Sequence, residues 1–362
     1  MDGRVYNFNP GPATLPLDVL RQAQQELLNY KGTGMSVMEM SHRSKDFEAI
    51  VHEAEALCKA IAGIGDDYRV LFLQGGASMQ FALIPYNFLP VGTHAYYAVT
   101  GNFAEKAFAE AQRAGLAKMA VSTAADKHNR IPAQHELNFP PEAAYLHITT
   151  NNTVYGTEWH YIPETNGVPL IADMSSNIFS RPLDYGKFAL AYAGAQKNLG
   201  PAGVTLVIVR KSMLEKVPED LPNMFSYKVM AKQNSLYNTP PTFGIYMLKL
   251  VLEWLKDLGG LPAIARQNRE KAGMIYAAID NSDGFYRGHA QKESRSLMNI
   301  TFHLPSGELE QKFVAEAAAK GLVGLKGYRT VGGIRASVYN AMPRAGCELL
   351  ATFMDDFAGK NR

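Results

Sequence analysis

The feature that most constrains the fold is an alternation of short apolar segments with helical segments between Arg69 and Arg210. The apolar segments are VLFL, HAYYAV, AYLHIT, LIADM and VTLVIV. A helical pattern that begins near Met79 separates VLFL from HAYYAV, and another that begins near Asn102 separates HAYYAV from AYLHIT. Strands that alternate with helices indicate a mainly parallel sheet covered by helices on both faces, an α/β fold. Ligands of such sheets bind at the carboxyl ends of the strands, so functional residues are expected there.

Two helices are expected ahead of this region. The first is predicted to run through Leu28. It is expected to open at Thr14 and Pro16, because Thr14 can cap the helix with its side chain and a proline is tolerated in the first turn. The second is predicted from about Ser44 to Ile61, because its apolar residues recur at steps of three and four.

The last third of the chain is typical of a smaller α+β unit. Helical patterns at 243–258 and 262–280 are followed by the segment SLMNITFHL, a helix at about 309–320 and the segment GGIRASVY. A chain of 362 residues is better read as two domains than as one. We predict a large domain over residues 16–255, a small C-terminal domain over 256–362, and an N-terminal segment, 1–15, packed against the small domain.

Composition and simple motifs argue against several classes of protein. A formal net charge of +2 gives no support for a nucleic-acid or membrane-surface partner. The two cysteines, Cys58 and Cys347, lack the spacing of a disulfide framework or zinc site, and no HExxH pair occurs, so no metal is expected. The N-terminus lacks the apolar core of a signal peptide, and a cytoplasmic location is expected. Gly63-Ile64-Gly65 precedes a strand and lacks a third glycine, so it does not match the dinucleotide fingerprint.

The most informative segment runs from residue 168 to 210 and contains Asp173 at the end of an apolar strand and Lys197 among small residues. Each alone has an ordinary interpretation, as a turn residue and a solvated lysine. Together they match the needs of pyridoxal phosphate: an amine that bonds to the aldehyde, and a carboxylate that keeps the pyridine nitrogen protonated. The small neighbours of Lys197 leave space for a cofactor and predict a lowered pKa for its amine.

A second element, Gly75-Gly76-Ala77-Ser78, lies between a predicted strand and a predicted helix. Small residues there allow backbone amides to approach an anion at the helix N-terminus, and the Ser78 hydroxyl adds a donor. A tight strand-to-helix turn without a ligand is the alternative interpretation.

Longer motifs carry a resemblance to a known family. From Phe8 to the C-terminal region the chain is similar to the phosphoserine aminotransferases, which are class V, fold-type I enzymes dependent on pyridoxal 5′-phosphate. The motifs are FNPGPATLP, SVMEMSHRSKDF, GAQKNLGPAGV, NTPPTFGIYM and KGYRTVGGIRASVYNAM. The resemblance implies a mainly parallel sheet of the seven-stranded type and a smaller C-terminal α+β domain.

The resemblance also implies roles at a cofactor site. Lys197 holds the cofactor as a Schiff base and moves the proton during catalysis, and Asp173 pairs with the pyridine nitrogen. Thr153 binds the phenolic oxygen of the ring, and Phe103 stacks on the ring. The phosphate is bound by Ala77, Ser78 and Gln196 and by two residues of the neighbouring subunit, Asn238 and Thr239, so each active site needs a homodimer.

Arginines account for substrate recognition in this resemblance. Arg335 binds the α-carboxylate of the substrate, which a planar guanidinium can do with two hydrogen bonds. His42, Arg43 and Arg329 bind the second anion, a phosphate or the side-chain carboxylate of glutamate. The chain departs from the family pattern at three positions: Phe103, where many members have tryptophan, Tyr328, where some have histidine, and Ser78, where others have arginine. These departures bear on affinity and anion preference more than on the type of reaction.

The implied reaction transfers an amino group between L-glutamate and 3-phosphohydroxypyruvate, giving O-phospho-L-serine and 2-oxoglutarate. Whether the chain also acts on the 4-phosphohydroxythreonine substrate pair of vitamin B6 synthesis stays open. The alternatives are another class V aminotransferase, such as an alanine–glyoxylate enzyme, a desulfurase, for which neither cysteine has the required setting, and a non-catalytic binding module.

Overall fold

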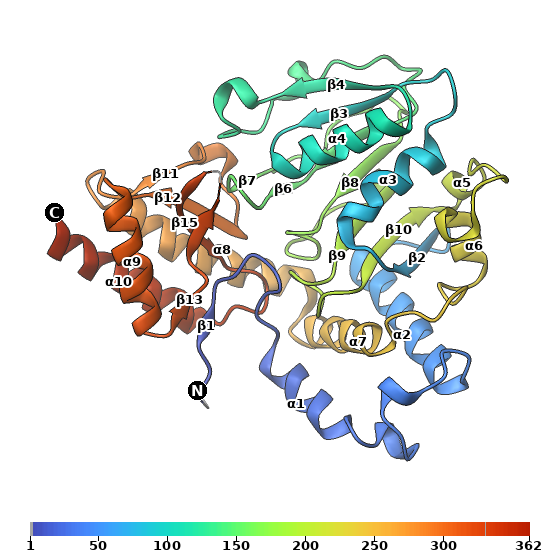
Figure 1. Ribbon diagram of the computed structural model, residues 1–362, viewed down its shortest axis with the longest axis horizontal. Helices are drawn as coiled ribbons and strands as arrows, with labels where there is room; N and C mark the ends of the chain where they lie inside the picture. The colour runs from blue at the N-terminus through green and yellow to red at the C-terminus, as the bar shows by residue number, and fades with distance from the viewer. Residues whose placement is uncertain (1–2, 330) are drawn as a thin grey trace.

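A seven-stranded sheet forms the centre of the larger unit in this computed structural model, which describes residues 3–329 and 331–362 (Figure 1). The strand order is β2-β10-β9-β8-β5-β3-β4, and every pairing is parallel except those of β10, which is antiparallel to β2 and β9. The strands are β2 Tyr68–Leu73, β3 Ala95–Val99, β4 Ala117–Ser122, β5 Leu146–Thr149, β8 Leu170–Asp173, β9 Leu190–Gly194 and β10 Thr205–Arg210. The predicted α/β fold with a mainly parallel seven-stranded sheet is therefore confirmed.

Helices cover both faces of this sheet (Figure 1). One apolar core includes residues of α1, α2 and α7, and the other includes residues of α3, α4 and α6. Alternate residues of a strand supply the two cores: in β8, Leu170 and Ala172 face the first and Ile171 the second. The helices are α1 Leu17–Glu26, α2 Lys45–Ala62, α3 Gly76–Phe88, α4 Asn102–Ala114, α5 Lys211–Leu214, α6 Tyr227–Lys232 and α7 Thr242–Asp257.

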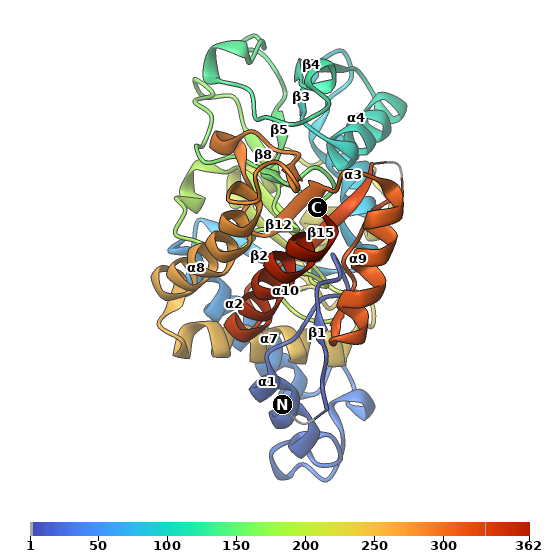
Figure 2. The same cartoon turned by 90° about the vertical axis from the view of Figure 1, so that its left-hand side faces the viewer.

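The smaller unit is built on an antiparallel four-stranded sheet of order β11-β12-β15-β14. Figure 2 shows α8, α9 and α10 lying over this sheet, and their apolar side chains form a third core with β12 and β15. The elements are α8 Gly260–Asp280, β11 Arg287–Gly288, β12 Asn299–His303, α9 Gly307–Ala319, β13 Leu322–Val323, β14 Lys326–Tyr328, β15 Gly332–Ser337 and α10 Arg344–Asn361.

The two units share elements at their border. α8 contributes Leu261 and Ile264 to the core of the larger unit and Ala272 and Ile275 to the core of the smaller one. The N-terminal strand β1 (Tyr6–Asn7) pairs in parallel with β13. Residue 255, chosen from the sequence as the domain boundary, lies inside α7, and residues 1–2 lie outside the described part. The domain limits therefore stay a prediction.

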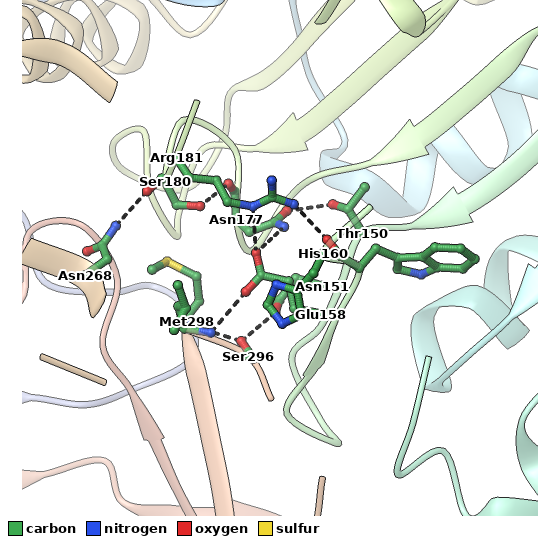
Figure 3. A network of polar contacts seen from close by, with 12 residues as sticks. Thr150, Asn151, Glu158, His160, Asn177, Ser180, Arg181, Asn268, Ser296 and Met298 are labelled. Atoms are coloured by element: carbon green, nitrogen blue, oxygen red, sulfur yellow. Dashed lines mark hydrogen bonds and ion pairs between the residues drawn. The ribbon is translucent and has the colours of Figure 1, made fainter. Parts of the chain in front are cut away.

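Buried polar contacts join the larger unit to the smaller one. They involve β6 (Asn151–Asn152), β7 (Thr157–Glu158) and the segment before β12, as Figure 3 shows. Glu158 is 1% exposed and accepts from Asn177 Nδ2 at 3.1 Å and from Leu297 N at 3.0 Å, with Arg181 Nε 3.4 Å away. A buried carboxylate needs such partners, so these contacts fix β12 against the larger unit.

Two local predictions differ in outcome. Ser44 caps α2, because its side chain accepts from Phe47 N, as expected. Thr14 was expected to cap α1, and this is wrong: the helix begins at Leu17 without a side-chain cap, and the Thr14 hydroxyl donates to the carbonyl of Asn7 at 2.9 Å. The hydroxyl holds the N-terminal loop instead. Strands β4 and β9 were not predicted from the sequence.

Candidate active site

A cavity of about 260 Å³ opens where β5 and β8 end and α3 begins. Ligand sites of parallel sheets occur at this edge. The cavity is lined by Gly75, Gly76, Ala77, Ser78, Phe103, Thr149, Asn151, Thr153, Asp173, Ser175, Ser176, Gln196 and Lys197. Seven of the residues predicted for the cofactor from the sequence are among them: Ala77, Ser78, Phe103, Thr153, Asp173, Gln196 and Lys197.

Asp173 is the last residue of β8 and is 4% exposed. Its Oδ1 accepts from Ser175 N at 2.9 Å. Burial raises the pKa of this carboxyl group, against the lowering effect of the Ser175 contacts and of the Lys197 charge. A buried carboxylate that lines a cavity is well suited to a cationic N–H group of a ligand, which would supply the charge compensation that burial demands.

Lys197 extends into the same cavity from the segment after β9. Its Nζ donates to Thr153 Oγ1 at 2.7 Å and lies 5.3 Å from the centroid of the Phe103 ring. Burial lowers the pKa of the amine to about 8, and the charge of Arg335 acts in the same direction while Asp173 opposes it. A neutral amine is the form that attacks an aldehyde, so this lysine is prepared for that reaction.

The lowered pKa gives a testable pH dependence. We expect the full-length chain, freed of cofactor, to capture added pyridoxal phosphate at a rate that rises with pH through about 8 and then levels off. A lysine with the usual pKa of 10.5 would keep gaining reactivity well above that pH. Stopped-flow absorbance measures the rate, and the Lys197→Ala variant gives the background. A rate that rises continuously toward pH 10 would contradict the assigned environment of the amine.

The turn between β2 and α3 forms a cradle at the N-terminus of a 13-residue helix. Gly75 has φ 88°, and a Cβ there would lie 2.5 Å from Cβ of Met79, so neither the backbone nor the space tolerates a larger residue. α3 begins at Gly76, and the first amides of a helix have no partner within it. Together with Ala77 and Ser78 at the cavity wall, the turn is suited to bind a phosphate.

The N-terminal loop closes over the lysine from the other side. A Cβ on Gly11, whose φ is 137°, would lie 3.3 Å from Lys197 Cγ and 3.4 Å from Gln196 Cγ. The Ala13 amide donates to the carbonyl of Gln196 at 2.9 Å. The sequence motif FNPGPA therefore belongs to the wall of the site, and the glycine allows the close approach.

Arg335 lies on β15 of the smaller unit and is 6% exposed. Its guanidinium carbon is 5.9 Å from the centroid of the Tyr328 ring, and its Nε has no hydrogen-bond partner among the described residues. Burial lowers the pKa of this arginine, and its charge acts on Lys197. A buried guanidinium with free donor capacity near the reactive amine is suited to a carboxylate of a ligand.

Besides Arg335, which does not line this cavity, five predicted residues lie outside it. Arg329 is exposed and lines a separate cavity of about 780 Å³ between α9 and the β14–β15 hairpin. His42 and Arg43 lie in the connection between α1 and α2, which Figures 1 and 2 place at the far end of the larger unit from β15. Asn238 donates to Gln74 Oε1 at 3.3 Å, and Thr239 next to it is exposed. A single chain therefore does not bring His42 and Arg43 together with Arg329.

Four polar residues of the cavity wall were not named from the sequence: Thr149, Asn151, Ser175 and Ser176. Thr149 and Asn151 follow the apolar part of AYLHIT, and the two serines follow LIADM. The sequence contained a signal for these four residues, because polar residues directly after a buried parallel strand lie at the functional edge of the sheet.

Comparison with known proteins agrees with this geometry. A family model described as aminotransferase class-V matches residues 5–350. The chain belongs to the class-V aminotransferase family. It is 60% identical to the phosphoserine aminotransferase of Herpetosiphon aurantiacus over 98% of this chain and 99% of the relative.

Two solved structures extend the likeness. The phosphoserine aminotransferase from Bacillus circulans subsp. alkalophilus has a TM-score of 0.98 and 52% identity, covering 99% of both chains. The phosphoserine aminotransferase from Trichomonas vaginalis, solved with pyridoxal phosphate bound, has a TM-score of 0.92 and 37% identity, covering 97% of this chain and 100% of that one. The chain thus resembles phosphoserine aminotransferases over its full length.

The residues present fit pyridoxal phosphate. The cavity combines an amine of lowered pKa, a buried carboxylate, an aromatic ring and a helix N-terminus, which correspond to the aldehyde, the ring nitrogen, the ring face and the phosphate of the cofactor. In the described part of the chain, no group of histidine, cysteine and acidic residues could hold a metal ion, and no helix is long and apolar enough to cross a membrane.

Proposed function

We propose that this chain is a pyridoxal-phosphate-dependent phosphoserine aminotransferase. It transfers an amino group reversibly between L-glutamate and 3-phosphohydroxypyruvate, giving O-phospho-L-serine and 2-oxoglutarate. The observation that carries the proposal is the convergence of Lys197, Asp173 and the α3 cradle on one cavity, in a chain 60% identical to a phosphoserine aminotransferase over almost its whole length.

The chemistry divides between the cofactor and the chain. Bound pyridoxal phosphate supplies an aldehyde for reversible bonding to amines and a ring that withdraws electrons from the α-carbon of the substrate. Lys197 supplies the amine that holds the cofactor, and its Nζ then takes the proton from the α-carbon. Asp173 keeps a proton on the ring nitrogen, Thr153 binds the phenolic oxygen, and Phe103 fixes the plane of the ring.

Substrate binding falls to arginines of the smaller unit and to two residues between α1 and α2 of the larger unit. Arg335 binds the α-carboxylate, because a buried guanidinium can hold it with two charge-assisted hydrogen bonds. His42, Arg43 and Arg329 bind the second anion, which is the phosphate of one substrate pair and the side-chain carboxylate of the other.

The second anion site requires a homodimer. His42 and Arg43 are far from Arg329 within one chain, and the connection that carries them exposes Leu27, Leu28, Met35 and Met38, with Leu28 83% exposed. Exposed apolar side chains gathered in one segment are typical of a surface that a partner covers. In the dimer, Asn238 and Thr239 reach the cofactor phosphate of the neighbouring subunit. We further propose that the dimer acts in the cytoplasm.

The role of Arg329 can be tested with a neighbour as control. We expect Arg329→Ala to raise the KM for O-phosphoserine about 10- to 100-fold, because a charge-assisted hydrogen bond contributes about 1.5–3 kcal/mol, while cofactor content stays unchanged. Lys326→Ala, which removes an exposed cation from the same hairpin, should have little effect. Steady-state kinetics with O-phosphoserine, and with alanine as a donor that has no second anion, measure the KM of each variant. An equal rise in KM for both donors would argue against recognition of the second anion by Arg329.

A further inference from the structure

Glu310, in the first turn of α9, binds the backbone at the base of the hairpin that carries Arg329. Its Oε2 accepts from Gly333 N at 3.0 Å. Its Oε1 accepts from Leu304 N at 3.4 Å and lies 3.2 Å from His303 Nδ1. The Glu310 side chain is 20% exposed, so its charge needs such partners. One carboxylate on the helix therefore holds the end of β12 and the start of β15 together.

The Gly333 amide lies just beyond the end of a strand pairing. The pairing of β12 with β15 ends at Phe302 and Ile334, one residue away from Gly333 along β15. Gly333 is buried, and a buried amide needs an acceptor, which Glu310 supplies with a charged oxygen. A Cβ on Gly333, whose φ is 70°, would lie 2.7 Å from the carbonyl oxygen of Phe302. The start of β15 is therefore packed closely against β12 where Glu310 binds it.

Two contacts connect this point to Arg329. Gly332, the first residue of β15, pairs with Tyr328, the last residue of β14. The carbonyl of Tyr328 accepts from Val331 N at 3.0 Å, which closes the turn of the hairpin. Arg329 directly follows Tyr328, and Figure 2 shows α9 lying beside β15. The position of Arg329 therefore depends on how α9 holds the hairpin.

We propose that Glu310 is a positioning residue for recognition of the second anion: it fixes the β14–β15 hairpin against α9 and so places Arg329 for the phosphate of the substrate. This inference rests on the proposed role of Arg329 and adds a residue outside the cofactor cavity. Arg335 does not depend on this contact, because it lies within the sheet and pairs with Thr301 of β12.

The direction of the effect separates positioning from a simple charge effect. Glu310 and Arg329 line the same cavity, and a negative charge there by itself disfavours a bound anion. Removal of that charge alone would lower the KM for O-phosphoserine. Release of the hairpin should raise this KM, because Arg329 must then be ordered when the substrate binds.

Glu310→Ala should raise the KM for O-phosphoserine about 3- to 10-fold, the effect expected when one hydrogen bond that holds the hairpin is lost. The KM for alanine, a poorer donor without a second anion, should stay unchanged, because Arg335 and the cofactor cavity are intact. The absorbance of the bound cofactor should also be unchanged. Steady-state kinetics and the visible spectrum of the full-length enzyme measure these quantities.

Two comparisons separate this role from a merely structural one. Glu316→Ala removes another carboxylate of α9, which lies 3.9 Å from Lys312 Nζ and does not line the cavity beside Arg329. It should leave both KM values unchanged. In an Arg329→Ala background, Glu310→Ala should cause no additional rise in the KM for O-phosphoserine, because the group that it positions is already missing. A similar rise in Glu316→Ala, or a full additional rise in the Arg329→Ala background, would overturn the proposal.

The folded Glu310→Ala variant decides the main comparison. An unchanged or lowered KM for O-phosphoserine, or an equal rise for alanine, overturns the positioning role and leaves the proposed function intact if Arg329→Ala raises the KM for O-phosphoserine alone. If Arg329→Ala has no effect, the proposed second-anion site fails, and this inference fails with it. If Glu310→Ala does not fold, Glu310→Asp keeps the charge on a side chain too short to hold both strands. A rise confined to O-phosphoserine in Glu310→Asp supports the proposal, and an unchanged KM overturns it.

Discussion

Lys197→Ala should abolish transamination, with kcat lower by at least about 10⁴-fold, because one side chain supplies both the amine that holds the cofactor and the base at the α-carbon. The purified variant should also lose the absorbance of the lysine-bound cofactor. Folding should be little affected, since the Lys197 amine makes its hydrogen bond to Thr153 alone among the described residues. Steady-state kinetics and the visible spectrum measure the two effects.

A matched control for this variant lies on the same aromatic ring. Lys106 Nζ is also 5.3 Å from the Phe103 centroid, but the side chain is exposed on α4 and does not line the cavity. Lys106→Ala should keep near wild-type turnover and colour. Normal turnover in Lys197→Ala would contradict the assignment of the catalytic lysine.

Asp173→Asn should lower kcat about 10²- to 10³-fold, the loss typical when one preorganised electrostatic contact to the reacting system is removed. Asparagine keeps the size of the side chain and an oxygen that can accept from Ser175 N, but it cannot balance the charge of a protonated ring nitrogen. Cofactor should still bind, because the lysine and the phosphate cradle are unchanged. Steady-state kinetics together with the bound-cofactor spectrum separate the loss of rate from a loss of cofactor.

Asp184→Asn provides the comparison for that substitution. Asp184 is exposed and accepts from Gly186 N at 3.0 Å, a contact that asparagine reproduces. This variant should match the wild type. A kcat for Asp173→Asn within a factor of two or so of wild type would show that the buried charge is not needed.

The parts of the structure that the sequence predicted correctly are those with a strong local pattern. β2, β3, β5, β8 and β10 are short apolar runs, and Ser44 precedes an amphipathic helix, so periodicity and capping preference identify them. Asp173 was found because it ends such a run, and Lys197 because it lies among small residues in the same segment, 168–210.

The elements that were missed have weak patterns. β9, LAYAG, is rich in small residues with low strand preference, and β4, AKMAVS, is a half-exposed edge strand. Threonine is a residue type that often caps helices, but in the folded chain the hydroxyl of Thr14 donates to the carbonyl of Asn7 instead. Local propensity cannot anticipate a contact that the tertiary structure creates.

The candidate site also contains both residues that the sequence could predict and contacts that it could not. Asp173 ends β8, and Lys197 and Thr153 lie three and four residues after β9 and β5, so the carboxyl edge of the sheet brings all three to one cavity. The contacts of Tyr339 with Pro10 and Asn299 join segments up to 329 residues apart, and no spacing in the sequence signals them. The clustering of Arg43 with Arg329 depends on a second subunit and stays a prediction.

The most direct test of the central claim is a half-reaction titration. O-phosphoserine, glutamate and alanine are added separately to the purified protein, and conversion of the lysine-bound cofactor absorbance to that of the aminated cofactor is followed. We expect rapid conversion with O-phosphoserine and with glutamate but not with alanine. Conversion by alanine without conversion by O-phosphoserine would contradict the phosphoserine assignment, and a colourless protein that stays unresponsive after added cofactor would contradict the aminotransferase function itself.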